Sequence, residues 1–130
     1  MSGRGLRCQE PHRLSKQEVE AILENGTPLA ISEALVSAAF HQSDREFARR
    51  VIFEHARNGS DGTRATAVLC IGHVARIDGD LPPDLVVELV ADALCDEDPA
   101  VRGQAIAALQ DIECVMPDTA ARIKALASCK

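Results

Sequence analysis

Apolar residues recur at helical spacing in the segment DEDPAVRGQAIAALQDI, residues 96–112. The apolar positions are Val101, Ala105, Ala108, Leu109 and Ile112. They fall on one side of a helix, and polar residues fall mostly on the other. Asp98 can cap free backbone N–H groups, and Pro99 suits the first helical position because its missing donor is not needed there. We therefore predict a helix that begins at Asp98 and buries a face rich in alanine.

Two earlier segments repeat this pattern. In SDGTRATAVLCIGHVA, Ser60 takes the place of Asp98, and four further positions align with residues 102–112 in constant register: Arg64, Ala67, Ile71 and Val74. In TPLAISEALVSAAF, Thr27 and Pro28 repeat the Asp98–Pro99 start, and Ala34 matches Ala105, although Ile31 replaces the arginine. Each copy follows a segment that also predicts a helix: SKQEVEAILEN, SDREFARRVIFEHARN and PDLVVELVADALC. The predicted unit is a helix pair, repeated three times.

The predicted helix ends agree with this division. Two helices begin with the capping-box pattern, Ser15 with Glu18 and Ser43 with Glu46. Three glycines stand where a helix end would use a left-handed residue: Gly26, Gly59 and Gly79. With a terminal helix near residues 119–127, the fold class is all-α. The D-P-x-V-R start and a repeat of roughly 34–40 residues resemble the HEAT and armadillo class of α-solenoids. We predict one HEAT-like domain over residues 15–130, preceded by a flexible basic tail over residues 1–14.

The composition limits the classes of function. No apolar run is long enough to span a bilayer, and the first residues lack the apolar segment of a signal peptide, so we expect a cytoplasmic protein without a membrane partner. Cys70 and His73 lie three residues apart on one predicted helix, a spacing that a metal site or a thiol–imidazole pair could use. Because no second pair completes such a site, we predict no catalytic, cofactor or metal residue and no enzyme activity. An enzyme that uses Cys70 and His73 is the least favoured alternative.

The acidic surplus lies in the second half of the chain. Residues 1–58 hold eight Lys/Arg and eight Asp/Glu, whereas residues 59–130 hold six and twelve, which accounts for the net charge of −6. Four acids follow one another at i, i+4 spacing, and two precede them; we name all six the acidic stripe: Asp78, Asp80, Asp84, Glu88, Asp92 and Asp96. Like charges at this spacing repel by a few tenths of a kcal/mol per pair. The stripe is either a solvated face that favours solubility or a docking surface for a basic partner. A nucleic-acid partner is disfavoured because the chain is acidic and has no Trp or Tyr.

Three consecutive segments add a resemblance to a known family: EALVSAAFHQSDREFARRVIFEHA, GTRATAVLCIGHVARIDGDL and DPAVRGQAIAALQDIECVM. They look like short bacterial HEAT-repeat proteins, a family that includes immunity proteins of contact-dependent and other polymorphic toxin systems. The most specific element is LCIGHVARIDGDL with its Gly72–His73 pair, and Asp78 departs from an expected histidine.

The resemblance implies a protein that binds and blocks a cognate toxin domain, with no chemistry of its own. Many such toxins are nucleases, whose surfaces must be cationic to hold phosphates. We therefore expect an immunity protein, monomeric when free, that docks a cationic toxin through the acidic stripe. The next surface to consider is the exposed side of the second helices, near His73, Arg76, Gln110 and Glu113. The alternative function is a general HEAT-like scaffold or adaptor.

Overall fold

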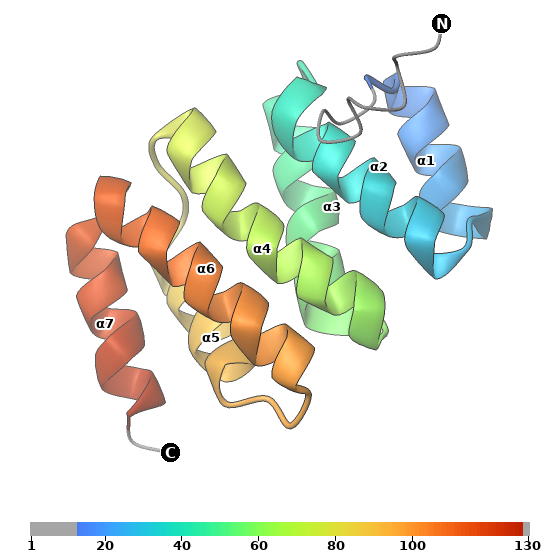
Figure 1. Cartoon of the computed structure of the whole chain (residues 1–130). Helices are drawn as coiled ribbons and strands as arrows, with labels where there is room; N and C mark the ends of the chain where they lie inside the picture. The colour runs from blue at the N-terminus through green and yellow to red at the C-terminus, as the bar shows by residue number, and fades with distance from the viewer. Residues whose placement is uncertain (1–12, 129–130) are drawn as a thin grey trace, which may run out of the picture.

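The computed structural model describes residues 13–128, in which it contains seven α-helices and no strands (Figure 1). In chain order the helices are α1 (Lys16–Asn25), α2 (Pro28–His41), α3 (Arg45–Asn58), α4 (Asp61–Asp78), α5 (Pro83–Leu94), α6 (Pro99–Val115) and α7 (Pro117–Ala127). The all-α prediction of three helix pairs and a terminal helix is confirmed. The predicted tail lies mostly outside the described residues. Leu14, which we assigned to that tail, packs against the core and donates its backbone N–H to Ser37 Oγ.

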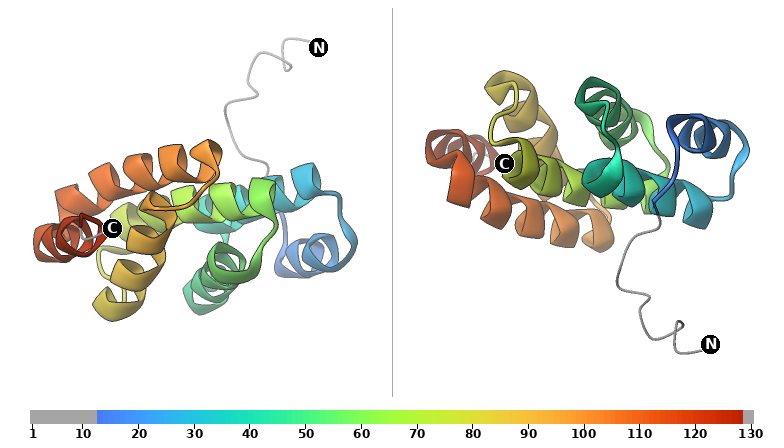
Figure 2. Two further views of the ribbon diagram at one scale, coloured as in Figure 1. Left: turned by 90° about the horizontal axis from the view of Figure 1, so that it is seen from below. Right: turned by 90° about the horizontal axis from the view of Figure 1, so that it is seen from above.

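The helices form two layers. The second helices of the pairs, α2, α4 and α6, run parallel in one layer, so that their C-terminal ends lie at the same edge (Figure 1). The first helices, α1, α3 and α5, form the other layer, and α7 packs on both α5 and α6 (Figure 2). The contact between α4 and α6 is the most extensive in the molecule, whereas α3 and α5 touch each other little. The second-helix layer is therefore continuous, whereas neighbouring first helices, α1 and α3 as well as α3 and α5, contact each other little.

Local hydrogen bonds explain where the helices begin. Ser15 and Glu18 form the predicted capping box, and Asp98 Oδ1 accepts from the N–H of Ala100 at the start of α6. The predicted box at Ser43 is wrong. Asp44 caps α3 instead, and its Oδ1 accepts from the N–H of Phe47, because the carboxylate at this position reaches the free N–H groups of the first turn.

The three predicted helix-ending glycines differ in their backbone. Gly79 alone is left-handed, with φ 86°. Gly26 and Gly59 are extended, with φ of −78° and −70°, so the prediction of a left-handed residue at these two positions is wrong. Lack of room for a side chain explains the glycines at these positions. A Cβ atom at Gly26 or Gly59 would lie 2.6 Å from a backbone carbonyl oxygen of the preceding helix turn.

Small residues at equivalent repeat positions let the second helices approach one another. Ala34, Ala67 and Ala105 are all 0% exposed. Between α4 and α6 the approach is closest at Gly72, where a Cβ atom would lie 2.8 Å from the Cα atom of Ala108. The Gly72 of the Gly–His pair is thus a packing residue, because any side chain there would push the two helices apart.

The layer ends at α6, which changes the burial of its side chains. Leu35 and Val68 are 0% exposed, but the equivalent residue Ile106 is 51% exposed because no further second helix follows it in the described chain. Leu109, which we placed in the shared core, is only partly buried for the same reason, whereas its counterpart Ile71 is fully buried.

Candidate partner-binding surfaces

The acidic stripe begins at the last residue of α4, follows the exposed side of α5 and ends in the loop before α6. The opposite side of α5 carries apolar residues that face the core, among them Val86 and Val90, both 0% exposed. The amphipathic pattern therefore turns the three acids of α5, Asp84, Glu88 and Asp92, toward solvent.

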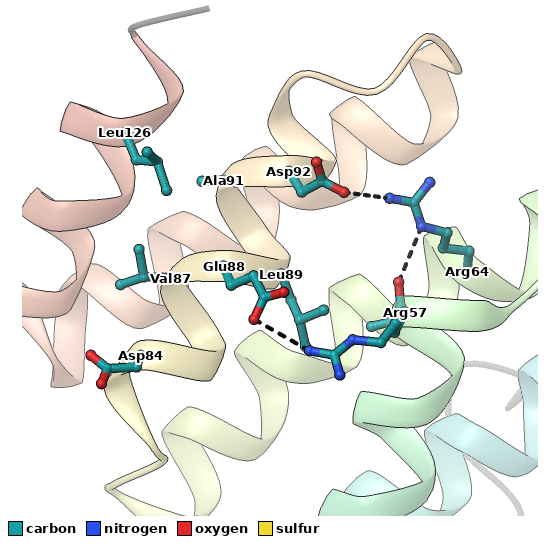
Figure 3. Close-up of a pocket in the computed structure, with 10 residues that line it drawn as sticks. Arg57, Arg64, Asp84, Val87, Glu88, Leu89, Ala91, Asp92 and Leu126 are labelled. Carbon is teal, nitrogen blue, oxygen red and sulfur yellow. Dashed lines mark hydrogen bonds and ion pairs between the residues drawn. The ribbon is translucent and has the colours of Figure 1, made fainter.

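Arginines of neighbouring helices lie against the stripe (Figure 3). Glu88 pairs with Arg57 of α3 at 3.3 Å, and Asp92 pairs with Arg64 of α4 at 3.5 Å. On the other side of α5, Asp84 pairs with Arg122 of α7 at 2.8 Å. These acids are exposed, so each ion pair contributes about 0–1 kcal/mol. The expected like-charge repulsion along α5 is offset by cations from three other helices.

Asp96 is held by its own loop. Its carboxylate accepts from the backbone N–H of Asp98 at 2.8 Å and from the guanidinium of Arg64. The hydrogen bond from Asp98 and then the one from Arg64 hold the pKa of Asp96 below its usual value. Asp96 therefore fixes the entry into α6 and is already occupied by intramolecular donors.

Asp78 is not on the surface. Its side chain is 7% exposed, and its two oxygens lie 2.8 Å from Arg45 Nε and 3.2 Å from Arg49 Nε. Arg45 also donates to the carbonyl oxygens of Ala39 and Gln42 at the end of α2. We name this arrangement the Asp78 clamp, since it joins the ends of α2 and α4 to the start of α3. Asp78 thus has a structural role in this clamp, and its role in partner binding stays a prediction. Asp80, in the turn after Gly79, is exposed and forms no ion pair with the described residues.

A groove of about 400 Å³ lies beside the stripe, between α3, α5 and α7 (Figure 3). Apolar side chains contribute part of its lining: Val87, Leu89 and Leu126. The charged groups at its rim are the paired ones described above, Arg57 with Glu88 and Arg64 with Asp92. A ligand in this groove would have to compete with these internal ion pairs.

A different cluster lies across the second-helix layer. Phe40 of α2, His73 of α4 and Asp111 of α6 occupy equivalent positions of the three repeats. The rings of Phe40 and His73 have centroids 4.8 Å apart, and His73 Nδ1 lies 4.0 Å from Asp111 Oδ2. Arg76 Nη1 lies 3.4 Å from Asp111 Oδ1. Together with the exposed Ile77, these residues form what we name the His73 cluster. The sequence pointed to His73 and Arg76, but Phe40 and Asp111 were missed, although their shared repeat position was available as a signal.

The imidazole of His73 is half-buried. Burial lowers its pKa, and the Asp111 carboxylate opposes this only in part. His73 is therefore neutral at neutral pH. Its place beside Gly72 explains the Gly–His pair: the glycine brings α4 and α6 together, and the histidine fills the space between Phe40 and Asp111.

Cys70 does not fit the role of nucleophile in the thiol–imidazole alternative. Cys70 is 0% exposed within the core, and burial raises the pKa of its thiol to about 12, so it supplies no reactive thiolate. Over residues 13–128, no group of three or more His, Cys, Asp or Glu side chains is placed to hold a metal ion. Within the same range no helix has the length and apolar character needed to cross a membrane.

Comparison with solved structures finds a similar protein. A chain of the crystal structure of a CDI complex from Cupriavidus taiwanensis LMG 19424 shares 34% sequence identity with this chain, with a TM-score of 0.71. The match covers 83% of this chain and 96% of that chain. No protein-family model and no curated protein matches the sequence. Assignment to the HEAT class therefore stays a prediction.

Proposed function

The chain belongs to the family of that chain of the CDI complex, and on this premise we propose that it is an immunity protein, which binds a toxin domain and blocks it. The observation that carries the proposal is the 34% identity over nearly the whole length of a protein that stands in such a complex. We take CDI to mean contact-dependent inhibition, a setting in which the producing cell must neutralise its own toxin. Such a role places the protein in the cytoplasm, as a monomer until it meets the toxin.

Inhibition by this chain is proposed to be steric and to need no catalysis. Its only described buried thiol has a raised pKa, and residues 13–128 form a stack of seven helices. Occluding the active surface of the toxin is then sufficient for protection.

The proposed partner is cationic, as a toxin nuclease would be. Internal ion pairs neutralise every acid of the stripe except Asp80 locally, but the chain keeps its net charge of −6. A net field of this sign speeds association with a basic protein, an effect that weakens as salt is added. The stripe itself stays a candidate contact surface through its exposed members, Asp80, Asp84, Glu88 and Asp92.

Co-expression with the neighbouring gene tests the proposed function. The toxin encoded beside this gene should arrest growth when expressed alone, and this chain should restore growth and co-purify with the toxin domain. Failure to protect and to bind would refute the immunity role and leave the adaptor alternative.

Charge reversal tests the stripe as a contact surface. The double variant Glu88→Lys, Asp92→Lys should slow association with the toxin if these acids meet the partner. Because the variant loses the pairs with Arg57 and Arg64, it should also be destabilised by about 1 kcal/mol, although the like-charge repulsion along α5 is relieved.

A further inference from the structure

We propose that the toxin docks on the outer face of the second-helix layer, at the His73 cluster, and that it presents there a Lys or Arg side chain beside an apolar contact. This inference rests on the proposed function and names the surface that performs it. The occupant is a basic protein surface, not a second copy of this chain.

Exposed apolar side chains gather at this edge of the layer. Phe40 is 42% exposed, Ile77 46% and Val115 36%, and they stand near the C-terminal ends of α2, α4 and α6. These three ends lie together in the fold (Figure 1). Large apolar residues that stay exposed at one edge of a fold are typical of protein interfaces, where a few buried anchor residues carry most of the binding energy.

The charges around Phe40 favour a cation. Asp111 Oδ1 accepts from Arg76 Nη1 at 3.4 Å, whereas Asp111 Oδ2 lies 4.0 Å from His73 Nδ1 and accepts no hydrogen bond from a described residue, so one carboxylate oxygen stays open to a donor. The last turn of α6 contains no basic residue that would compensate the negative end of the helix dipole. A Lys or Arg of the partner could contact the exposed part of the Phe40 ring and donate to Asp111.

The neutral state of His73 fits the same partner. Burial keeps the imidazole uncharged at neutral pH, so it does not repel an incoming cation. The acids of both surfaces face arginines of this chain, Asp111 as well as Glu88 and Asp92, and the His73 cluster differs by its exposed apolar side chains, Phe40 and Ile77.

Binding of an inactivated form of the neighbouring toxin domain tests the inference, measured by titration calorimetry with full-length variants. Phe40→Ala should weaken affinity at least about tenfold and Asp111→Asn about fivefold, since a central aromatic and a charge-assisted contact are lost. Ile77→Ser, at a more exposed position, serves as a second apolar variant if Phe40→Ala unfolds. Leu126→Ala is the matched control, because Leu126 is 45% exposed but lines the groove of the stripe face; its affinity should stay within twofold.

The outcomes separate the two proposals. If the wild type binds and all the cluster variants bind within twofold of it, the docking surface is elsewhere and only this inference falls. If Leu126→Ala weakens binding as much as Phe40→Ala, the stripe face is the interface. If the folded wild type neither binds the toxin nor protects the cell, both the immunity role and this inference are refuted.

Discussion

Replacing Asp78 by Ala should destabilise the protein without altering a partner surface. The change leaves Arg45 and Arg49 facing each other without the carboxylate that both contact, at 2.8 and 3.2 Å. Breaking a fully buried pair costs about 3–5 kcal/mol. Since the two arginine side chains keep 26% and 32% exposure, water can partly solvate them, and we expect a loss of about 2–3 kcal/mol. For a domain of this size, that lowers the melting temperature by about 6–12 °C.

Asp80 provides the matched control for this experiment. It is an acid of the same stripe, two positions further on, but exposed, so Asp80→Ala should change stability by at most about 0.5 kcal/mol. Urea unfolding followed by circular dichroism measures both variants, and equal slopes would show that the difference lies in the folded state. Equal midpoints for the two variants would refute the Asp78 clamp. A folded Asp78→Ala protein that loses toxin binding would instead support the predicted role of Asp78 in partner binding.

Three further predictions follow from burial. Ile71→Ala should lower the free energy of unfolding by about 2–5 kcal/mol and Leu109→Ala by about 1–2 kcal/mol, since only Ile71 is fully buried. Urea unfolding measures both variants. Equal losses would mean that Leu109 on α6 is as buried as Ile71. Iodoacetamide should label Cys114 in the native protein but Cys70 only after unfolding, as peptide mass mapping would show; native labelling of Cys70 would contradict its burial. Because the pKa of His73 is lowered in the folded protein, the unfolded chain binds a proton more readily than the folded one. The contribution of the neutral His73 to stability is therefore complete above pH 6.5 and is lost as the pH falls through the folded-state pKa. His73→Gln should reduce this loss.

The helices were predictable because their signals are local. The start of α6 depends on Asp98 and its two neighbours, and the repeat register followed from alanines at helical spacing. The prediction of the α3 cap was wrong although its signal is also local. Ser43 and Asp44 both offer an acceptor oxygen, and only the geometry of the loop selects Asp44.

The ionic partners were harder to predict because they come from other repeats. Glu88 and Arg57 are 31 residues apart, and Asp78 and Arg45 are 33 apart. An analysis of one helix at a time therefore finds repulsion between the acids of the stripe and misses the cations that offset it. These separations are close to the predicted repeat length, so a search for opposite charges one repeat apart would have found the partners of the stripe.

The repeated register gives this chain a way to diversify. At the inward position the three repeats carry the same residue, Ala34, Ala67 and Ala105, whereas at the outward position they carry Phe40, His73 and Asp111, which share neither size nor charge. Substitutions at the outward position change the exposed surface and leave the buried alanines of the inward position in place. A lineage can therefore exchange its partner by altering one row of the surface while inheriting an unaltered scaffold.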